Sequence, residues 1–244
     1  MSKIYVVGIG PGAYEDMTIR AAKALEECDL IVGYTVYVDL LKEHFAEKEF
    51  LTTPMRQEVK RCQMAFEEAK NGRKVAMVCS GDSGIYGMAS LMYEIGENYP
   101  DIELQIIPGV TAALGGSAVL GAPMSHDCCL ISLSDLLTPW ETIEKRLRLA
   151  GQADLVIALY NPSSKKRKTY LSKACNILMK SKSGEIVCGI VKNIARDGEE
   201  MHILTLQELE HTEVDMFSTV FIGNKDTKVI DGHMVTPRGY RKDI

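Results

Sequence analysis

Several glycine-rich segments hold the residues that could do chemistry, and each follows a short apolar run. The first is GIGPGA at 8–13, which satisfies the G-x-G-x-x-A pattern of dinucleotide-binding turns, with Asp29 about twenty residues further on as the ribose ligand. Pro11 removes a backbone N–H donor where a pyrophosphate needs one, and the helical periodicity begins only near Thr18. The segment therefore favours a ligand that lies against the glycine backbone over a nicotinamide or flavin dinucleotide. A tight turn without any ligand stays open as an alternative.

The second segment, SGDSGIYG at 80–87, combines three glycines with an acidic side chain. Glycine lets a backbone approach a ligand closely, and the carboxylate of Asp82 can accept hydrogen bonds from a ribose or an amine. The third, IPGVTAALGGSA from Ile106, ends an apolar run at Pro108 and offers Thr111 as the cap of a helix of small residues. Ordinary turns and helix caps use the same residue types, so neither segment alone identifies a ligand.

The elements that position these segments are predicted from hydrophobic periodicity. Segments of helical period follow Thr18 and lie at 59–69 and 140–150, and Thr205 with Glu208 has the spacing of a capping box. Strands alternating with amphipathic helices predict an α/β fold, mostly parallel in the first half, with ligands at the loops beyond the carboxyl ends of the strands. Apolar runs typical of strands covered on both faces lie at 3–8, 74–79, 103–107, 129–133, 154–160, 186–192 and 219–222.

Length and composition limit the class of protein. The chain has 244 residues, 46% apolar and 25% charged, and its 28 Lys and Arg against 33 Asp and Glu give a formal net charge of −5. This acidic balance argues against a nucleic-acid coat or a basic membrane-surface protein, and no apolar run is long enough for a membrane span. The small-residue stretch 109–121 separates two halves that each hold several strands, so we predict two domains, 1–115 and 116–244.

The seven cysteines are odd in number, scattered, and never spaced as C-x-x-C, so neither a disulfide framework nor a zinc ribbon is indicated, and no metal site is expected. Residues 1–12 are too short and too broken by Gly and Pro for a signal peptide. We therefore expect a cytoplasmic protein.

The strand-end segments together carry a family resemblance. GIGPG, SGDSGIYG, IPGVTA, LYNPSS and VFIGN, in this order over nearly the full length, resemble the tetrapyrrole methyltransferases, which use S-adenosylmethionine. Within that family, IVGYTVYVDLL, PMSHDCCLISLSDLLTPW, LYNPSSKKRK, VKNIARDGE and VTPRGY are most similar to the members that methylate C17 of precorrin-3B or cobalt-factor III in cobalamin biosynthesis, with associated ring contraction. The resemblance implies a homodimer of two α/β domains, with the methyl donor in a cleft between them and S-adenosylhomocysteine as the product.

The resemblance also assigns donor-binding residues at the strand ends. Ser83 stands where some relatives carry a proline straight after the Gly-Asp pair, which puts the loop shape there in question. The ribose and methionine part of the donor is assigned to the segment 81–85, with Pro11 bordering the site and residues 111–112 at the next loop, and the adenine side is assigned to the second half of the chain. The residues are Pro11, Gly81, Asp82, Ser83, Ile85, Thr111 and Ala112 in the first half, and Tyr160, Asn161, Ser218 and Thr219 in the second.

Residues for the tetrapyrrole substrate are predicted on the same basis. A sulfonium methyl is already a strong electrophile, so the protein mainly needs to exclude water and align the reacting atoms. His126 and Asp127 are the first choice for proton handling during ring contraction, because the family's substrate-proximal segment falls here and His titrates near neutral pH. Candidates to face the macrocycle or its carboxylates are Tyr34, Thr35, Tyr37, Ser134, Asp135, Lys165 and Arg238.

Each of these assignments has a structural alternative. The His126–Asp127 pair can be a hydrogen-bonded structural pair, the tyrosines can be surface aromatics, and the basic run 165–168 can be a solvated loop. For the whole chain, the alternatives are a sibling methyltransferase acting at another ring carbon, one that modifies RNA or protein, and a non-catalytic nucleotide-binding module. The acidic balance speaks against RNA, and NADH binding without donor binding would favour the module.

Overall fold

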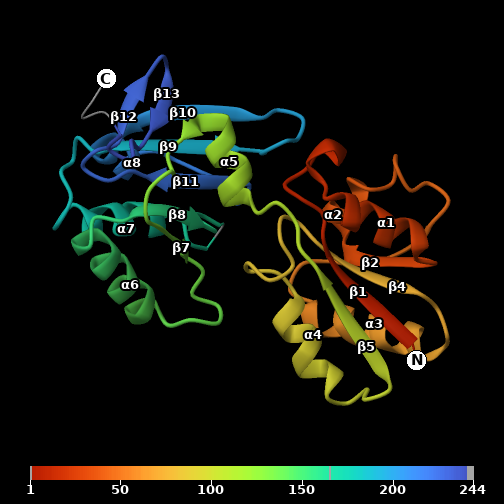
Figure 1. The fold of residues 1–244 in the computed structure, drawn as a ribbon. Helices are drawn as coiled ribbons and strands as arrows, with labels where there is room; N and C mark the ends of the chain where they lie inside the picture. Colours follow the sequence, from red (N-terminus) through yellow and green to blue (C-terminus); the bar gives the residue numbers. More distant parts are fainter. Residues whose placement is uncertain (1, 165, 241–244) are drawn as a thin grey trace. The chain divides into compact units, whose positions relative to one another are not determined.

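The computed structural model describes residues 2–164 and 166–240, drawn in Figure 1. The chain divides into two compact units, Met1–Ala112 and Ala113–Ile244. This division falls three residues before the boundary that the small-residue stretch suggested.

The first unit is a five-stranded parallel sheet in the order β3-β2-β4-β1-β5. Its strands are β1 (Ser2–Gly8), β2 (Leu30–Tyr34), β3 (Glu49–Thr53), β4 (Val75–Cys79) and β5 (Ile102–Ile107). The helices are η1 (Tyr14–Asp16), α1 (Ile19–Glu27), α2 (Thr35–Asp39), α3 (Glu58–Lys70) and α4 (Ala89–Gly96).

Both faces of this sheet are covered, which explains why its strands are apolar without alternation. Alternate side chains of the strands, such as Val6 and Val7, enter two different cores. Val6 packs in the core that includes α3 and α4 residues such as Phe66, and Val7 packs in the core that includes α1 residues such as Leu25.

The second unit is built on a mixed sheet in the order β10-β9-β11-β8-β7, in which only β7 and β8 are parallel neighbours. A small sheet in the order β12-β13-β6 is also present. The strands are β6 (Gly121–Ala122), β7 (Cys128–Ser132), β8 (Val156–Tyr160), β9 (Val187–Lys192), β10 (Glu200–Thr205), β11 (Ser218–Ile222), β12 (Lys228–Ile230) and β13 (His233–Val235). The helices are α5 (Ala112–Leu120), α6 (Trp140–Gln152), α7 (Tyr170–Leu178) and α8 (Leu206–Glu210).

The two faces of the larger sheet are covered by different helices. Side chains of α6, α7 and α8 share one core with the sheet. Helix α5 packs on the other side, where a Cβ on Gly116 would lie 2.9 Å from the ring of Phe221. The glycine allows α5 to lie close to β11.

The α/β class and the parallel sheet in the first half are confirmed, and each of the seven predicted strands is present. Two predicted helix starts are also confirmed by their caps. The Thr18 side chain accepts from the Ala21 N–H at 3.1 Å, and Thr205 with Glu208 forms a full capping box. Sequence periodicity missed β3, β6, β10, β12 and β13; of these, β10 and β12 are exposed along much of their length. None of the helices in the described part of the chain combines the length and apolar character needed to cross a membrane.

Candidate functional site

In the first unit, the carboxyl ends of β1 and β4 are joined directly through backbone. Gly10 and Gly81 form an antiparallel bridge: the Gly10 N–H donates to the Gly81 oxygen at 3.1 Å, and the Gly81 N–H donates to the Gly10 oxygen at 2.7 Å. A Cβ on Gly8 would lie 2.7 Å from both the Gly109 nitrogen and the Gly81 oxygen. Side chains are therefore excluded from this point, and three strand ends meet as bare backbone.

The carboxylate of Asp82 holds these loops in place. Its Oδ1 accepts from the N–H groups of Gly84 and Ile85 at 2.8 and 2.9 Å, and its Oδ2 accepts from the Gly109 N–H at 2.9 Å. Oδ1 thus closes the turn of its own loop, and Oδ2 ties that loop to the end of β5. A carboxylate offers about four acceptor sites, so one site on Oδ2 remains for a ligand hydroxyl.

Ser83 faces the protein interior. Its side chain is fully buried, and its hydroxyl donates to the Ile107 carbonyl at 3.0 Å, which makes a second link between the β4 loop and β5. The next two side chains, Ile85 and Tyr86, are 39% and 53% exposed, and Tyr86 has a φ of 55°, a strained conformation for an aromatic residue. The loop therefore presents backbone and apolar side chains outward.

All the donor-site candidates of the first unit lie at this one edge. Pro11 follows Gly10 in the bridge, and a Cβ on Gly81 would lie 3.5 Å from the Thr111 Cα and 3.6 Å from the Ala112 nitrogen. The structure thus brings together loops that are about a hundred residues apart in sequence. Their contacts with a ligand stay predictions.

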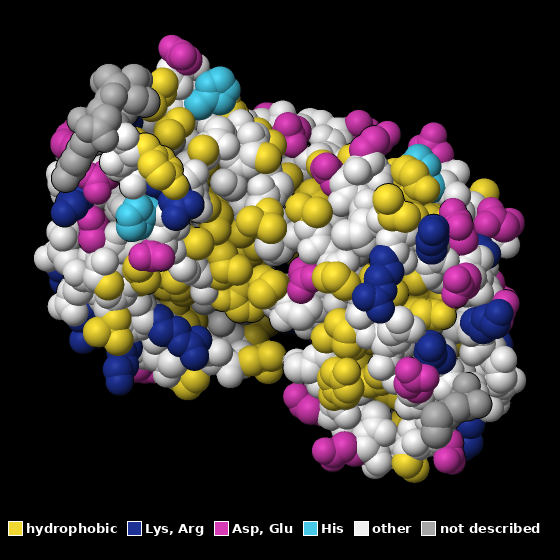
Figure 2. Space-filling view, in the orientation of Figure 1, with side chains coloured by type: hydrophobic (Ala, Val, Ile, Leu, Met, Phe, Trp, Pro, Cys, Tyr) yellow, Lys and Arg dark blue, Asp and Glu magenta, His cyan; other side chains and the backbone are white. Residues whose placement is uncertain are grey.

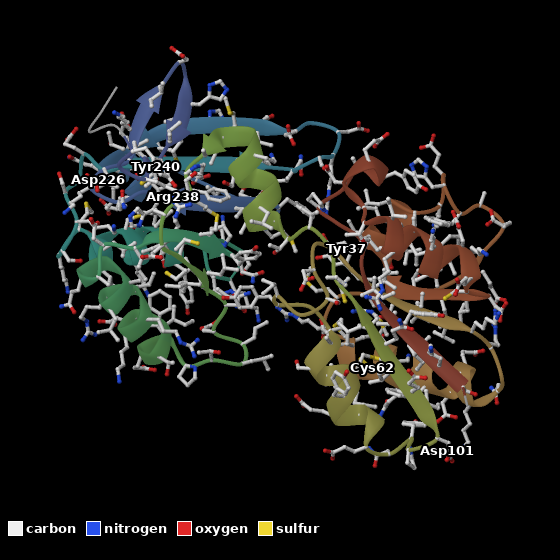
Figure 3. The ribbon with its side chains drawn as sticks, in the orientation of Figure 1. Tyr37, Cys62, Asp101, Asp226, Arg238 and Tyr240 are labelled. Carbon is white, nitrogen blue, oxygen red and sulfur yellow. The ribbon has the colours of Figure 1, made fainter. Side chains whose placement is uncertain are left out.

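The aromatic candidates for the substrate follow β2 at the same edge of the sheet. The rings of Tyr34 and Tyr37 meet edge to face, with 5.1 Å between centroids, and the Thr35 hydroxyl lies 3.5 Å from the Thr53 carbonyl. In Figure 3, Tyr37 lies at the end of the sheet toward which the strands point, and Asp101 marks the opposite end. All three candidates are half-buried.

In the second unit, the ends of β7 and β8 and the start of β11 share one edge, because β7 and β8 are parallel and β11 is antiparallel to β8. Tyr160 and Asn161 end β8. The Tyr160 hydroxyl accepts from the Ala113 N–H at 2.8 Å, in the first turn of α5, and the Asn161 amide donates to the Ser132 hydroxyl at 3.0 Å. Asn161 has a φ of 52°, which is tolerated better by Asn than by most residues.

Ser218 and Thr219, at the start of β11, are both buried at 5% exposure. Neighbouring residues on a strand point to opposite faces of the sheet, so these two side chains lie on different faces of β11. The Ser218 hydroxyl donates to Asp215 at 3.0 Å. The sequence placed both residues at this edge, and the structure separates them by face.

Ser134 and Asp135 belong to a side-chain network at the edge. Arg167 Nη1 donates to Ser134 Oγ at 2.8 Å and to Asp135 Oδ1 at 3.1 Å, and the Tyr170 hydroxyl donates to Asp135 Oδ2 at 2.6 Å. The hydrogen bond from Tyr170, followed by the one from Arg167, lowers the pKa of Asp135 below its usual value. Arg167 is thus engaged with protein acceptors, and Lys165 lies outside the described residues.

His126 and Asp127 lie elsewhere in this unit. They directly precede β7, so they lie at the opposite edge from Tyr160 and Asn161, and the Asp127 carbonyl accepts from the Val156 N–H at the start of β8. Both side chains are exposed, and the Asp127 N–H donates to His126 Nδ1 at 2.8 Å. The structure does not bring this pair together with the other candidates of the second unit.

Arg238 lies in the segment that follows β13, near Asp226 and Tyr240 in the view of Figure 3. Its side chain is exposed, with the guanidinium carbon 5.9 Å from the centroid of the Tyr240 ring. Two residues earlier, the Thr236 N–H donates to the Ala122 carbonyl. Arg238 is therefore held by local contacts and carries no acidic partner in the described part of the chain.

Metal and surface charge add little to this site. Within residues 2–164 and 166–240, no group of three or more His, Cys, Asp or Glu side chains is placed to hold a metal ion. On the face shown in Figure 2, Lys and Arg side chains are interspersed with Asp and Glu on both units.

Comparison with known proteins decides the family. Residues 3–210 match the family model described as Tetrapyrrole (Corrin/Porphyrin) Methylases. The chain belongs to this family. The predicted resemblance is thereby confirmed.

Individual tetrapyrrole methylases cover the whole chain. It is 48% identical to the "Probable cobalt-factor III C(17)-methyltransferase" of Salmonella typhimurium, over 96% of this chain and 98% of that protein. It is 43% identical to the "Cobalt-factor III methyltransferase" of Priestia megaterium, over 98% of this chain but only 45% of that longer protein. The crystal structure of the methyltransferase CobJ matches with a TM-score of 0.88 and 34% identity, over 97% of this chain and all of that one.

Sequence reasoning missed one charged residue of this tetrapyrrole methylase. Arg61, in the first turn of α3, is only 4% exposed although it carries a guanidinium. The periodic apolar positions predicted for this helix are Val59, Cys62, Phe66 and Ala69, and an arginine beside an apolar stripe normally extends into solvent. Only the packing of the first turn of α3 against the end of β3 reveals that Arg61 is buried.

Proposed function

We propose that this protein transfers the methyl group of S-adenosylmethionine to C17 of cobalt-factor III, with the associated ring contraction, in cobalamin biosynthesis. The single observation that carries the proposal is the similarity over the whole chain to a relative named for that reaction. Cobalt-factor III is preferred to precorrin-3B because both relatives described above carry cobalt-factor III in their names.

The edge of the first unit fits a methyl donor of this kind. Gly8, Gly81 and Gly109 bring three strand ends together as backbone with no room for side chains, an arrangement here called the glycine cradle, and Asp82 Oδ2 keeps one acceptor site for a ribose hydroxyl. When bound, S-adenosylmethionine supplies an electrophilic methyl group. The chain's own part is to orient the donor against a preset backbone and to exclude water with apolar side chains such as Ile85 and Tyr86.

Proton handling by His126 and Asp127 is part of this proposal. An imidazole side chain can both donate and accept a proton, which is the chemistry that ring contraction needs. We expect His126→Gln to lower the rate of ring contraction by at least about a hundredfold, the lower end for general acid–base catalysis, while the affinity for S-adenosylhomocysteine stays unchanged. A contraction rate equal to that of the unaltered protein would remove His126 from the chemistry.

The family resemblance also supports a homodimer in the cytoplasm. Light scattering of the purified protein tests the assembly: twice the mass of one chain is expected, and a single-chain mass at micromolar concentration would contradict it. Fractionation of the source cells tests the location.

The central experiment has two steps. Calorimetric titration with S-adenosylhomocysteine is expected to show saturable binding, and the same titration with NADH none. Transfer of labelled methyl from S-adenosylmethionine to cobalt-factor III, followed by NMR of the product, then identifies the methylated carbon. NADH binding in place of S-adenosylhomocysteine would overturn the enzyme class, whereas methylation at another ring carbon would leave the class and overturn the position.

A further inference from the structure

Arg61 is a buried cation at the carboxyl edge of the first unit. Its Nε donates to the Thr53 hydroxyl at 2.9 Å, and its Nη2 donates to the Pro54 carbonyl at 3.1 Å. Thr53 is the last residue of β3, and the guanidinium carbon lies 5.8 Å from the ring centroid of Tyr34, the last residue of β2. The guanidinium is therefore fixed where β2 and β3 end.

No ion pair in the described part of the chain includes Arg61. The nearest acidic residue on its own helix, Glu58, accepts from the Arg56 N–H instead. Burial of a charge is costly unless the charge is paired, and the two neutral acceptors and the Tyr34 ring leave Arg61 without an anionic partner. A structural arginine in this position would normally have a carboxylate partner, as Arg73 of the same unit does in Glu49 and Glu68.

One end of the guanidinium remains available. Nη1 of Arg61 makes no hydrogen bond with the described residues. Every fully buried side-chain nitrogen or oxygen among these residues does have a hydrogen-bond partner, so Nη1 is not fully buried. Nη1 therefore reaches solvent, although the residue as a whole is only 4% exposed. A guanidinium nitrogen that keeps contact with solvent and has no acceptor within the protein can donate to a carboxylate.

The position of Arg61 separates it from the donor cradle. In the sheet order β3-β2-β4-β1-β5, the glycine cradle lies at the ends of β4, β1 and β5, and Arg61 lies at the ends of β3 and β2. The aromatic pair Tyr34 and Tyr37, which suits contact with a macrocycle, stands at the end of β2. A ligand that bound over these rings would place its acidic side chains within reach of Nη1.

We propose that Arg61 is the carboxylate-binding residue of a substrate subsite formed with Tyr34 at the ends of β2 and β3. The ligand is an acidic side chain of the tetrapyrrole, so the inference rests on the proposed function and deepens it. The methionine carboxylate of the methyl donor is the other source of the same chemistry, and the experiment distinguishes the two.

The test compares three variants with the unaltered protein: Arg61→Met, which keeps the length and removes the charge; Arg61→Lys, which keeps the charge and loses the planar fork; and Arg73→Met as the matched control. The substrate probe is uroporphyrin III, a macrocycle with carboxylates on every pyrrole ring, titrated by fluorescence with S-adenosylhomocysteine present. The donor probe is S-adenosylhomocysteine itself, titrated by calorimetry.

We expect Arg61→Met to raise the dissociation constant for uroporphyrin III by about tenfold or more, and Arg61→Lys by less. The dissociation constant for S-adenosylhomocysteine should stay within about twofold in both, and Arg73→Met should change neither constant. A purely structural role would instead weaken both probes together, without rescue by lysine.

Three results would overturn the proposal: an unchanged dissociation constant for uroporphyrin III in Arg61→Met, a loss confined to S-adenosylhomocysteine, and no binding of uroporphyrin III by the unaltered protein. If Arg61→Met does not fold, NMR of the unaltered protein replaces the variant. The ¹⁵Nε resonance of Arg61 is then expected to shift on addition of uroporphyrin III, and an unchanged resonance would overturn the proposal. Failure of S-adenosylhomocysteine to bind the unaltered protein would instead defeat the proposed function.

Discussion

The two strand-end edges are held together in different ways. In the first unit, the ends of β1 and β4 are joined by the backbone bridge between Gly10 and Gly81, and the Asp82 carboxylate accepts hydrogen bonds from three backbone N–H groups of these loops. In the second unit, side chains join the ends of β7 and β8 to the following segment, through the Asn161–Ser132 pair and the network around Asp135. The first edge therefore depends on close glycine backbone contacts braced by Asp82, and the second depends more on pairs of side chains.

Because of this difference, substitutions at the two edges should have effects of different size. A close contact between backbone segments cannot accommodate a new methyl group, because the backbone atoms that it meets cannot rotate away. A side-chain network can re-form with water or a neighbouring group, so each of its members contributes less. Substitutions at the first edge should therefore have larger effects than those at the second.

The largest effect is expected from Gly109→Ala. Its Cβ would lie 2.6 Å from the carbonyl carbon of Gly8 and closer still to the Gly81 oxygen, so the strand ends must separate. We expect a loss of about 3 kcal/mol or more in the free energy of unfolding, measured by chemical denaturation. Gly184→Ala is the control, since its Cβ would meet only the Gln207 side chain at an ordinary 3.4 Å. Equal stability of the two variants would show that the first edge is not a rigid joint.

Asp82→Ala should have the next largest effect. Three backbone N–H groups lose their charged acceptor, so we expect the free energy of unfolding to fall by about 2 kcal/mol. The affinity for S-adenosylhomocysteine should fall about tenfold, because the cradle loses its shape and the ribose its acceptor. The control is Asp29→Ala, which removes an acceptor of the Lys74 N–H at the opposite edge of the same sheet. If Asp82→Ala and Asp29→Ala reduced the affinity for S-adenosylhomocysteine equally, Asp82 would have no specific role in binding the donor.

The same contrast explains how much the sequence predicted. The features of the first edge can be predicted from short stretches of sequence. In GIGPG and SGDSG the glycines directly follow a strand, and the turn closed by Asp82 spans only residues 82–85. Its position at the carboxyl edge then follows from the α/β pattern. The candidates Pro11, Gly81 and Thr111 therefore meet in space although they are far apart in the chain.

The second edge could not be predicted in the same way. Asn161 meets Ser132 across 29 residues, and Asp135 meets Tyr170 across 35, so no local spacing marks these pairs. The basic run 165–168 suggested free cations for substrate carboxylates, but Arg167 is held by Asp135 and Ser134. Arg61 was missed for the converse reason, because burial of a cation depends on packing that periodicity does not describe.

Asp135→Asn tests the strength of the side-chain network through pH. Because the pKa of Asp135 is lowered in the folded protein, the ionised group stabilises the fold above its unfolded pKa, and this contribution disappears as pH falls through the folded pKa. The unaltered protein should therefore exceed Asp135→Asn in stability by about 1 kcal/mol at pH 7, and the gap should close below about pH 4. Asp127→Asn, which changes an exposed carboxylate at the other edge, should show no such gap. A constant difference at all pH values would mean that the charge of Asp135 does not contribute.

Tyr160→Phe is expected to have the smallest effect and examines a hydrogen bond of the second edge in which a side chain accepts from the backbone. The hydroxyl accepts from the Ala113 N–H in the first turn of α5, so its removal should cost about 0.5 to 1 kcal/mol of unfolding free energy. The affinity for S-adenosylhomocysteine should stay within about twofold, because phenylalanine keeps the ring that would contact the adenine side. Tyr99→Phe, which removes an exposed hydrogen bond to Glu67, is the control and should cost less, since water replaces that partner. A large loss of donor affinity in Tyr160→Phe would mean that the hydroxyl itself binds the donor, and the second edge would then depend on polar contacts to the ligand as much as on contacts within the protein.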